Sequence, residues 1–149
     1  MPDEQKIDDI VSSFRRIHHS FHQLNWQGAE EQNLTSTQLM VLRKLSQFPD
    51  IGNSELAEHM HLGNSAMSGI VDRMVNAGLV ERTRSEHDRR SFKLRVTETG
   101  RLIRERSRQA LLKRLAPLAD MPESDVQELL RIHNQILAII AQGRENKDL

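Results

Sequence analysis

The sequence predicts a mainly α-helical protein with a small β-hairpin wing, arranged as a winged helix-turn-helix domain with additional N- and C-terminal helices. Apolar residues recur at helical spacing over most of the 149 residues. Two short helical segments, 52–62 and 63–78, are separated by a break at Gly63, which is the pattern of a helix-turn-helix. The apolar spacing then changes to two in "SFKLRV", residues 91–96, as expected for a strand with one buried face.

Composition indicates one domain, 1–149, with a core made mainly of aliphatic residues. The chain has 21 basic and 21 acidic residues, a mean hydropathy of -0.59 and only five aromatic residues apart from histidine. It has no cysteine, which excludes disulfides, cysteine nucleophiles and thiolate metal sites. No apolar run reaches the roughly 18 residues of a membrane span, and the acidic start "MPDEQKIDDI" lacks a signal-peptide pattern. We therefore expect a cytoplasmic protein without a membrane partner.

The first two helices are predicted from their spacing and their ends. Thr35 and Gln38 form a capping-box pattern at the start of the second helix, and Pro49 is expected to stop it. Gly28 is expected to end the first helix, whose apolar positions are Ile7, Ile10, Val11, Phe14, Ile17, Phe21 and Leu24.

The third and fourth helices are short and amphipathic. Gly52 or Asn53 is expected to cap the third helix, and Gly78 has the position of a C-terminal helix glycine. The residues expected to face inward are Leu56, Ala57 and Met60 from the third helix and Met67, Ile70, Val71 and Met74 from the fourth.

A hairpin and two further helices complete the predicted order. "LVERTR" is expected to pair with "SFKLRV", so that Phe92, Leu94 and Val96 face inward. Thr97 is expected to cap a helix through about Leu115, and a break precedes a last helix that starts near Pro122. The apolar stripe of that helix is Val126, Leu129, Leu130, His133, Ile136, Leu137 and Ile140.

Positive charge gathers around the hairpin although the chain as a whole is neutral. Residues 81–108 hold ten basic and five acidic residues, a net charge of +5, and the other 121 residues therefore carry -5. Arginines are attracted to narrow DNA minor grooves, which makes Arg89 and Arg90 candidates for groove contacts. Arg84 and Lys93 are expected near phosphates, and Asp88 is expected to position an arginine. The alternative is a solvated hairpin whose edge is protected by charge.

The fourth helix would act as the recognition helix of a helix-turn-helix, which places its N-terminal residues at base edges in the major groove. Gly69 lies inside that helix, where glycine costs about 1 kcal/mol relative to alanine. Close approach to DNA, tight helix packing and simple tolerance of the glycine are all consistent with it. The outward residues expected to contact DNA are Asn64, Ser65, Ala66, Ser68, Gly69, Asp72 and Arg73.

These segments resemble the MarR family of bacterial transcription regulators. The resemblance covers nearly the whole chain, and its most specific parts are "IVDRMVNAGLV" and "DRRSFKLRVTETG", in which Asp88 and Arg90 fill the family's Asp-x-Arg wing signature. It implies that residues 34–96 are a DNA-binding lobe, and that 5–27 and 97–142 supply dimerisation helices. It also implies a homodimer that represses at a palindromic operator in double-stranded DNA and is released by a small molecule. Apolar stripes on the terminal helices, longer than the winged unit can cover, independently favour a dimer.

Effectors of the family commonly bind between the dimerisation helices and the DNA-binding lobe. The resemblance therefore implies a pocket for a small aromatic or lipophilic effector, with His18, Phe21, His22, Trp26 and Met40 as candidates. The spacing of His18 and His22 is also compatible with a metal, but no carboxylate or cysteine of suitable spacing completes such a site. We predict neither a metal nor a cofactor.

Two other functional classes were weighed. No phosphate loop, nucleophile elbow or metalloprotease motif occurs, so an enzyme is not expected. A winged-helix module that binds a protein or RNA through its basic hairpin is the stronger alternative. The joint presence of a recognition helix, wing arginines and dimerisation helices favours DNA.

Overall fold

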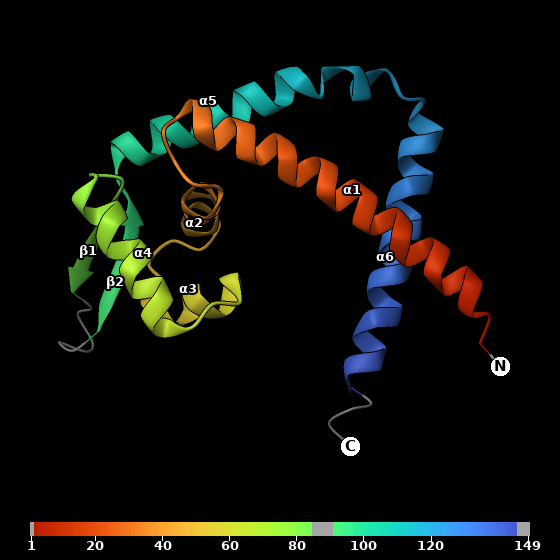
Figure 1. Ribbon diagram of the computed structural model, residues 1–149, viewed down its shortest axis with the longest axis horizontal. Helices are drawn as coiled ribbons and strands as arrows, with labels where there is room; N and C mark the ends of the chain where they lie inside the picture. The colour runs from red at the N-terminus through yellow and green to blue at the C-terminus, as the bar shows by residue number, and fades with distance from the viewer. Residues whose placement is uncertain (1, 85–90, 146–149) are drawn as a thin grey trace. The chain divides into compact units, whose positions relative to one another are not determined.

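The computed structural model describes residues 2–84 and 91–145, which form a mainly helical chain with an antiparallel two-stranded sheet (Figure 1). The predicted fold class is confirmed. In chain order the elements are α1 (Glu4–Glu31), α2 (Ser36–Gln47), α3 (Asn53–Met60), α4 (Asn64–Asn76), β1 (Val80–Arg84), β2 (Phe92–Val96), α5 (Glu98–Arg114), the 3₁₀ helix η1 (Ala116–Asp120) and α6 (Glu123–Glu145).

The chain divides into two compact units, residues 1–111 and 112–149. The first unit contains the helix-turn-helix and the hairpin, and the second contains η1 and α6. The description of 1–149 as a single domain therefore stays a prediction. Among the described residues, no helix has both the length and the apolar character that a membrane span requires.

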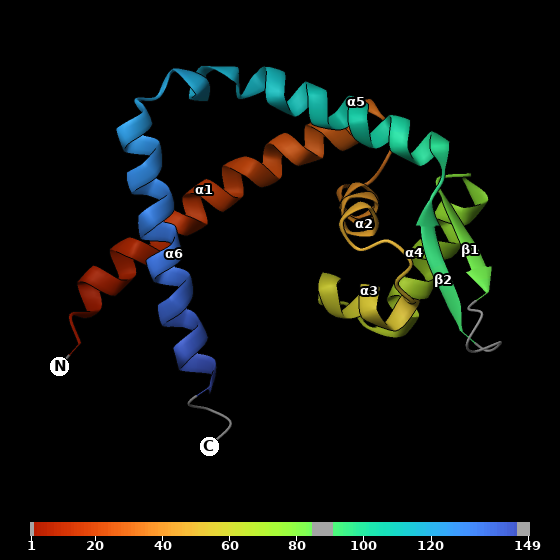
Figure 2. The same cartoon turned by 180° about the vertical axis from the view of Figure 1, so that it is seen from behind.

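The core of the first unit is aliphatic, as the composition predicts. Leu42 of α2, Leu56 of α3, Met67 and Met74 of α4, and Leu94 of β2 are all at most 1% exposed. Figure 2 shows α3 and α4 beside each other and the hairpin next to α4, and these elements are in contact. Every predicted inward position of α4 contributes to this core, with Ile70 packed at its margin.

Local hydrogen bonds explain where α2 begins and where α4 ends. Thr35 and Gln38 make the predicted capping box, in which each side chain accepts a hydrogen bond from the other residue's backbone N–H at 3.1 Å. At the end of α4, Gly78 has a left-handed φ of 74°. Its N–H donates to Val75, and the N–H of Leu79 donates to Met74, which is the Schellman arrangement.

A second junction ties the end of α4 to the start of α5. The Thr97 hydroxyl donates to the Gly78 carbonyl at 2.6 Å and accepts from the Gly100 N–H at 3.1 Å. The Thr97 N–H also donates to the Leu79 carbonyl. A β-carbon on Gly100 would lie only 2.3 Å from the Leu79 carbonyl oxygen, so the close approach of α5 to this turn requires glycine.

Two predictions about single residues are wrong. Gly28 does not end α1, because the helix continues to Glu31. Gly28 is instead buried against α5, where a β-carbon would meet the Ser107 hydroxyl at 3.3 Å. Phe92 is not turned into the core: it is 45% exposed, because β2 extends past the buried region that holds Leu94.

The last helix has the predicted apolar stripe but does not bury it within the described chain. Pro122 lies just before α6, and its carbonyl accepts hydrogen bonds from Asp125 and Val126. Leu129, Leu130 and Leu137 are 46%, 56% and 63% exposed. A stripe of this size on a helix surface is typical of an interface.

We predict that Gly100→Ala destabilises the fold by about 1–3 kcal/mol, because the new methyl group overlaps a backbone oxygen. Gly69→Ala is the matched control, since among the described side chains its β-carbon would meet just the Arg73 guanidinium, at 3.8 Å. It should stabilise α4 by up to about 1 kcal/mol through helix propensity. Urea unfolding at one fixed protein concentration measures both. Equal midpoints for the two variants would contradict the proposed role of Gly100.

Candidate nucleic-acid interface

The recognition helix α4 has one buried side and one polar side. Met67, Val71 and Met74 fix the buried side in the core. Of the predicted DNA-facing residues, Ser68 and Gly69 are half-buried, and the others are exposed: Asn64, Ser65, Ala66, Asp72 and Arg73. The structure therefore places all seven away from the core, on a surface made mostly of short side chains.

The N-terminus of α4 has no side-chain cap. Gly63 is the N-cap residue, and no side-chain hydrogen bond is made to the first turn. Backbone N–H groups at an uncapped helix start, together with the positive end of the helix dipole, favour a phosphate group. The Asn53 side chain donates to the Asn64 carbonyl at 3.3 Å and so links the starts of α3 and α4.

Packing among the described residues does not require glycine at position 69. Apart from the backbone of α4 itself and the adjacent residues, the one described atom within 4 Å of a β-carbon there is the Arg73 guanidinium nitrogen Nη2. Tight helix packing therefore loses its support as the interpretation of this glycine. Close approach to DNA and simple tolerance of a glycine at this position are the interpretations that stay.

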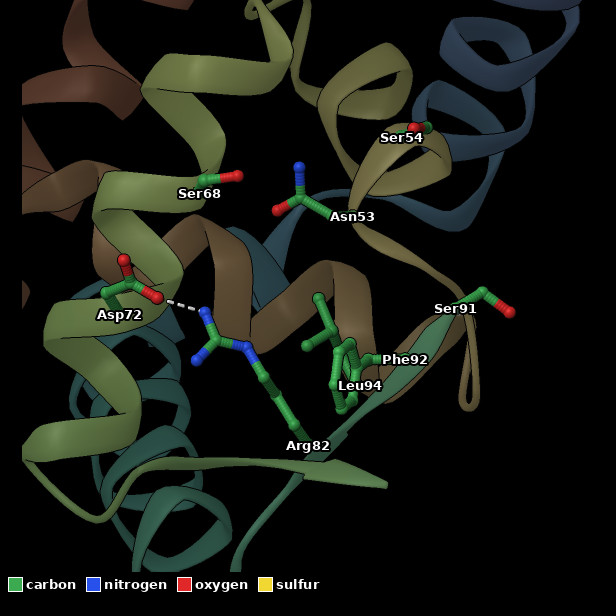
Figure 3. Close-up of a pocket in the computed structure, with 8 residues that line it drawn as sticks. All are labelled: Asn53, Ser54, Ser68, Asp72, Arg82, Ser91, Phe92 and Leu94. Atoms are coloured by element: carbon green, nitrogen blue, oxygen red, sulfur yellow. Dashed lines mark hydrogen bonds and ion pairs between the residues drawn. The ribbon is translucent and has the colours of Figure 1, made fainter. Parts of the chain in front are cut away.

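A groove of about 600 Å³ is lined by residues from the start of α3, from α4 and from the hairpin (Figure 3). Ser68 and Asn53 point toward one another across it, and Arg82 of β1 reaches the Asp72 carboxylate. Asp72 thus pairs with the wing while it lies on the polar side of α4. Sequence reasoning missed Arg82, although the residue lies in the basic run. The available signal was Asp72, the single acid on the outward side of α4, close in sequence to the basic run that holds Arg82.

The base of the hairpin is held by a second ion pair. Arg95 of β2 contacts the carboxylate of Asp50, which has a left-handed φ of 65° in the loop before α3. The hydrogen bond from Arg95 lowers the pKa of Asp50 and raises the pKa of Arg95 itself. Next to this pair, the Leu94 N–H donates to the Ile51 carbonyl at 2.9 Å. The wing therefore starts from a fixed base.

The hairpin displays part of its predicted basic surface. Arg84 is exposed at the end of β1, and Lys93 is half-buried on β2. Asp88, Arg89 and Arg90 lie outside the described residues, so their roles in the wing stay predictions.

The predicted effector residues only partly come together. His18 and Phe21 line a hollow of about 500 Å³ on α1 with Phe14, Arg15 and Ile17. The rings of His18 and His22 stack at 6.4 Å, but His22, Trp26 and Met40 do not line this hollow. The Trp26 indole donates to Glu30 at 2.7 Å. No group of three or more histidine, aspartate or glutamate side chains within the described ranges has the geometry to hold a metal.

The fold and this polar, partly basic surface define a winged helix-turn-helix protein of the DNA-binding class. A model of the MarR family matches residues 34–92. The transcriptional regulator YsmB of Bacillus subtilis is 30% identical over 144 residues, covering 96% of each chain. The B. subtilis repressor MdtR is 28% identical over 145 residues, covering 97% of this chain and 92% of its own. The chain belongs to the MarR family of transcriptional regulators.

The fold likeness extends over almost the whole chain. A MarR family protein from Bacillus stearothermophilus superposes with a TM-score of 0.84 at 23% identity. The match covers 95% of this chain and 99% of that one. At this identity the comparison supports the fold, including the helices outside the winged unit.

We predict that Asp72→Asn and Arg82→Gln change binding to random-sequence duplex DNA in opposite directions. Asp72→Asn removes a negative charge near the phosphates and should tighten this binding, whereas Arg82→Gln leaves Asp72 unpaired and should weaken it. Each change in folding stability should stay within about 1 kcal/mol, because the pair is exposed. Fluorescence anisotropy at several salt concentrations measures the binding.

Glu81→Gln is the control, because it makes the same change in net charge on the neighbouring exposed residue of β1. If Glu81→Gln and Asp72→Asn tighten binding equally, total charge rather than the position of Asp72 explains the effect.

Proposed function

We propose that this protein is a homodimeric transcriptional repressor that acts in the cytoplasm on a palindromic operator and is released by a small-molecule effector. The observation that carries the proposal is the α4 surface. It combines an uncapped helix start, short polar side chains and an adjoining basic hairpin. A helix of this kind can enter the major groove while the wing follows the neighbouring backbone.

Exposed apolar residues on the terminal helices support the homodimer. On α1, Ile7, Ile17 and Phe21 are 50%, 59% and 40% exposed. On α6, Leu137 and Ile139 are 63% and 60% exposed. Large apolar side chains exposed along a helix are typical of an interface. A two-fold dimer would present its two α4 helices to half-sites about 34 Å apart.

Solved structures of similar fold support the remaining parts of the proposal. An Escherichia coli MarR variant in complex with operator DNA has a TM-score of 0.72 and 20% identity, covering 92% of this chain and 99% of that one. Staphylococcus aureus MarR in complex with salicylate and kanamycin has a TM-score of 0.78 and 19% identity, covering 93% and 95%. An operator and a small effector are the corresponding ligands proposed for this chain. The effector class proposed from the α1 surface is aromatic or lipophilic.

Selection of bound fragments from a random pool of DNA duplexes tests the proposed function. An enriched inverted repeat with half-sites one helical turn apart is the expected result. Absence of any enriched sequence would refute operator binding, and would favour a winged-helix module that binds a protein or RNA.

We predict that Arg90→Ala weakens binding to the selected operator by about 1–3 kcal/mol and leaves the dimer intact. The reason is the proposed insertion of the Arg90 side chain into the minor groove. Arg106→Ala, an exposed arginine of α5, removes the same charge away from the wing and serves as the control. Gel-shift titration measures affinity, and sedimentation measures assembly. Equal affinities for the two variants would contradict the wing assignment.

A further inference from the structure

Phe92 is an exposed aromatic residue on the side of the hairpin that faces α4. It lines the groove of about 600 Å³ together with Asn53, Ser54 and Ser68 (Figure 3). The residue is 45% exposed, whereas Leu94, two positions along the same face of β2, is 1% exposed. An exposed aromatic ring beside short polar side chains in a groove is typical of a contact site.

The strand register places a cation directly beside this ring. Phe92 pairs with Arg84 across the two strands, and Leu94 pairs with Arg82. Side chains of directly opposite residues share a face of the sheet, with β-carbons about 5 Å apart. Arg82 identifies this face as the α4 side, because it reaches Asp72. Arg84 and Phe92 therefore stand next to each other on the α4 side of the hairpin, and both are exposed.

Arg84 differs from the arginines nearer the base of the hairpin. Arg82 is held by Asp72, and Arg95 is held by Asp50. Within residues 2–84 and 91–145, no acid pairs with Arg84. Its guanidinium group is therefore available to an external anion, and its planar donors fit a phosphate.

The shape of duplex DNA indicates what lies over this pair. One sugar–phosphate strand separates each major groove from the minor groove beside it. With α4 in the major groove and the wing in the adjacent minor groove, this strand crosses the space between α4 and the hairpin. Anionic phosphates and carbon-rich deoxyriboses alternate along the strand. A guanidinium group and an aromatic ring on neighbouring positions match this alternation.

We propose that Arg84 and Phe92 act as one unit that contacts a single nucleotide of the operator. The Arg84 guanidinium binds the phosphate, and the Phe92 ring packs against the deoxyribose joined to it. The contact reads no base, so it adds affinity and fixes the position of the wing without adding sequence information. This inference rests on the proposed function, because it specifies how the wing meets the DNA strand.

A thymine methyl group is the other apolar feature of DNA that an aromatic ring can contact. Such a contact would read sequence. The position of Phe92 beside Arg84, which is suited to a phosphate, favours the sugar.

Phe92→Ala should weaken binding about three- to tenfold, because the ring buries apolar surface against the sugar. The factor should be similar on the selected operator and on random-sequence duplex, since no base is read. The slope of log affinity against log salt should stay unchanged, because an apolar contact releases no counterion. Phe92→Leu keeps apolar surface and should retain most of the affinity. Fluorescence anisotropy at several salt concentrations measures all of these.

Phe48→Ala is the matched control for loss of an exposed ring. Phe48 lies at the end of α2, is 41% exposed and does not line the groove. This variant should bind DNA as the unmodified protein does. Equal losses in Phe48→Ala and Phe92→Ala would overturn the proposed contact.

Arg84→Gln should reduce the salt slope by about 1, because one phosphate contact is lost. The variant with both changes should lose less affinity than the product of the two single losses, because the arginine holds the phosphate whose sugar the ring contacts. Single losses that simply multiply would overturn the claim that the two residues act as one unit.

Urea unfolding separates a DNA contact from a structural role of Phe92. We expect Phe92→Ala to remain folded under the binding conditions. A fall in the folded fraction that accounts for the lost affinity would overturn the contact. If Phe92→Ala does not fold, Phe92→Thr lacks the ring, keeps a high strand propensity and should show the same loss.

Operator DNA with deoxyuridine in place of thymidine separates the sugar from the base. The loss caused by Phe92→Ala should be the same on both DNAs. If the difference between Phe92→Ala and the unmodified protein disappears on the deoxyuridine operator, the ring contacts a thymine methyl group and the sugar assignment is overturned.

The outcome is separable from the proposed function. Absence of DNA binding by the unmodified protein would overturn both proposals. DNA binding by the unmodified protein that Phe92→Ala and Arg84→Gln leave unchanged would overturn the proposed nucleotide contact and leave the repressor proposal in place.

Discussion

The close approach of Gly100 to the Leu79 carbonyl is the constraint on which the DNA-facing part of the molecule depends. The approach joins the end of α4 to the start of α5, and Thr97 strengthens it with hydrogen bonds to Gly78 and Gly100. The hairpin leaves and returns at this same point, since Val80 pairs with Val96. The directions of α4, the wing and α5 are therefore set together, over a few residues, by backbone geometry that tolerates no side chain at position 100.

Ion pairs orient arginine side chains at the wing, although the chain as a whole is neutral. The two acids beside the wing act as structural partners: Asp72 holds Arg82 against α4, and Asp50 holds Arg95 against the loop before α3. Both pairs are exposed, so each contributes little to the free energy of folding. Their effect is to fix the direction of long side chains near the proposed DNA-binding surface. Acids outside the basic segment 81–108 thus orient two of its arginines.

The sequence correctly predicted features that depend on residues close together in the chain. The capping box of Thr35 and Gln38, and the left-handed glycine after α4, follow from short-range patterns with one physical solution. The prediction for Gly28 was wrong because a glycine can either end a helix or allow another helix to pack closely against it. Only the position of Ser107 decides between the two roles. The prediction for Phe92 was wrong because alternation shows on which face of a strand a side chain lies, but does not show where the core ends.

The same difference between short-range and long-range features applies to the candidate site. Periodicity was enough to predict the polar side of α4, because one helix fixes all of its positions: Asn64, Ser65, Ala66, Ser68, Gly69, Asp72 and Arg73. The partnership of Asp72 with Arg82 spans two elements, and its discovery needed the hairpin register. The meeting of Arg43 with Arg104 spans 61 positions of the chain, and nothing in the local sequence of either residue announces it.

Helix α5 contains both Gly100, at the junction with α4, and Arg104, which lies near Arg43. Gly100 fixes its first turn to the end of the recognition helix, and Arg104 lies one turn further on, about 6 Å along the axis. The positive charges of Arg43 and Arg104 repel each other, and this repulsion acts on the same helix whose first turn Gly100 holds beside the hairpin.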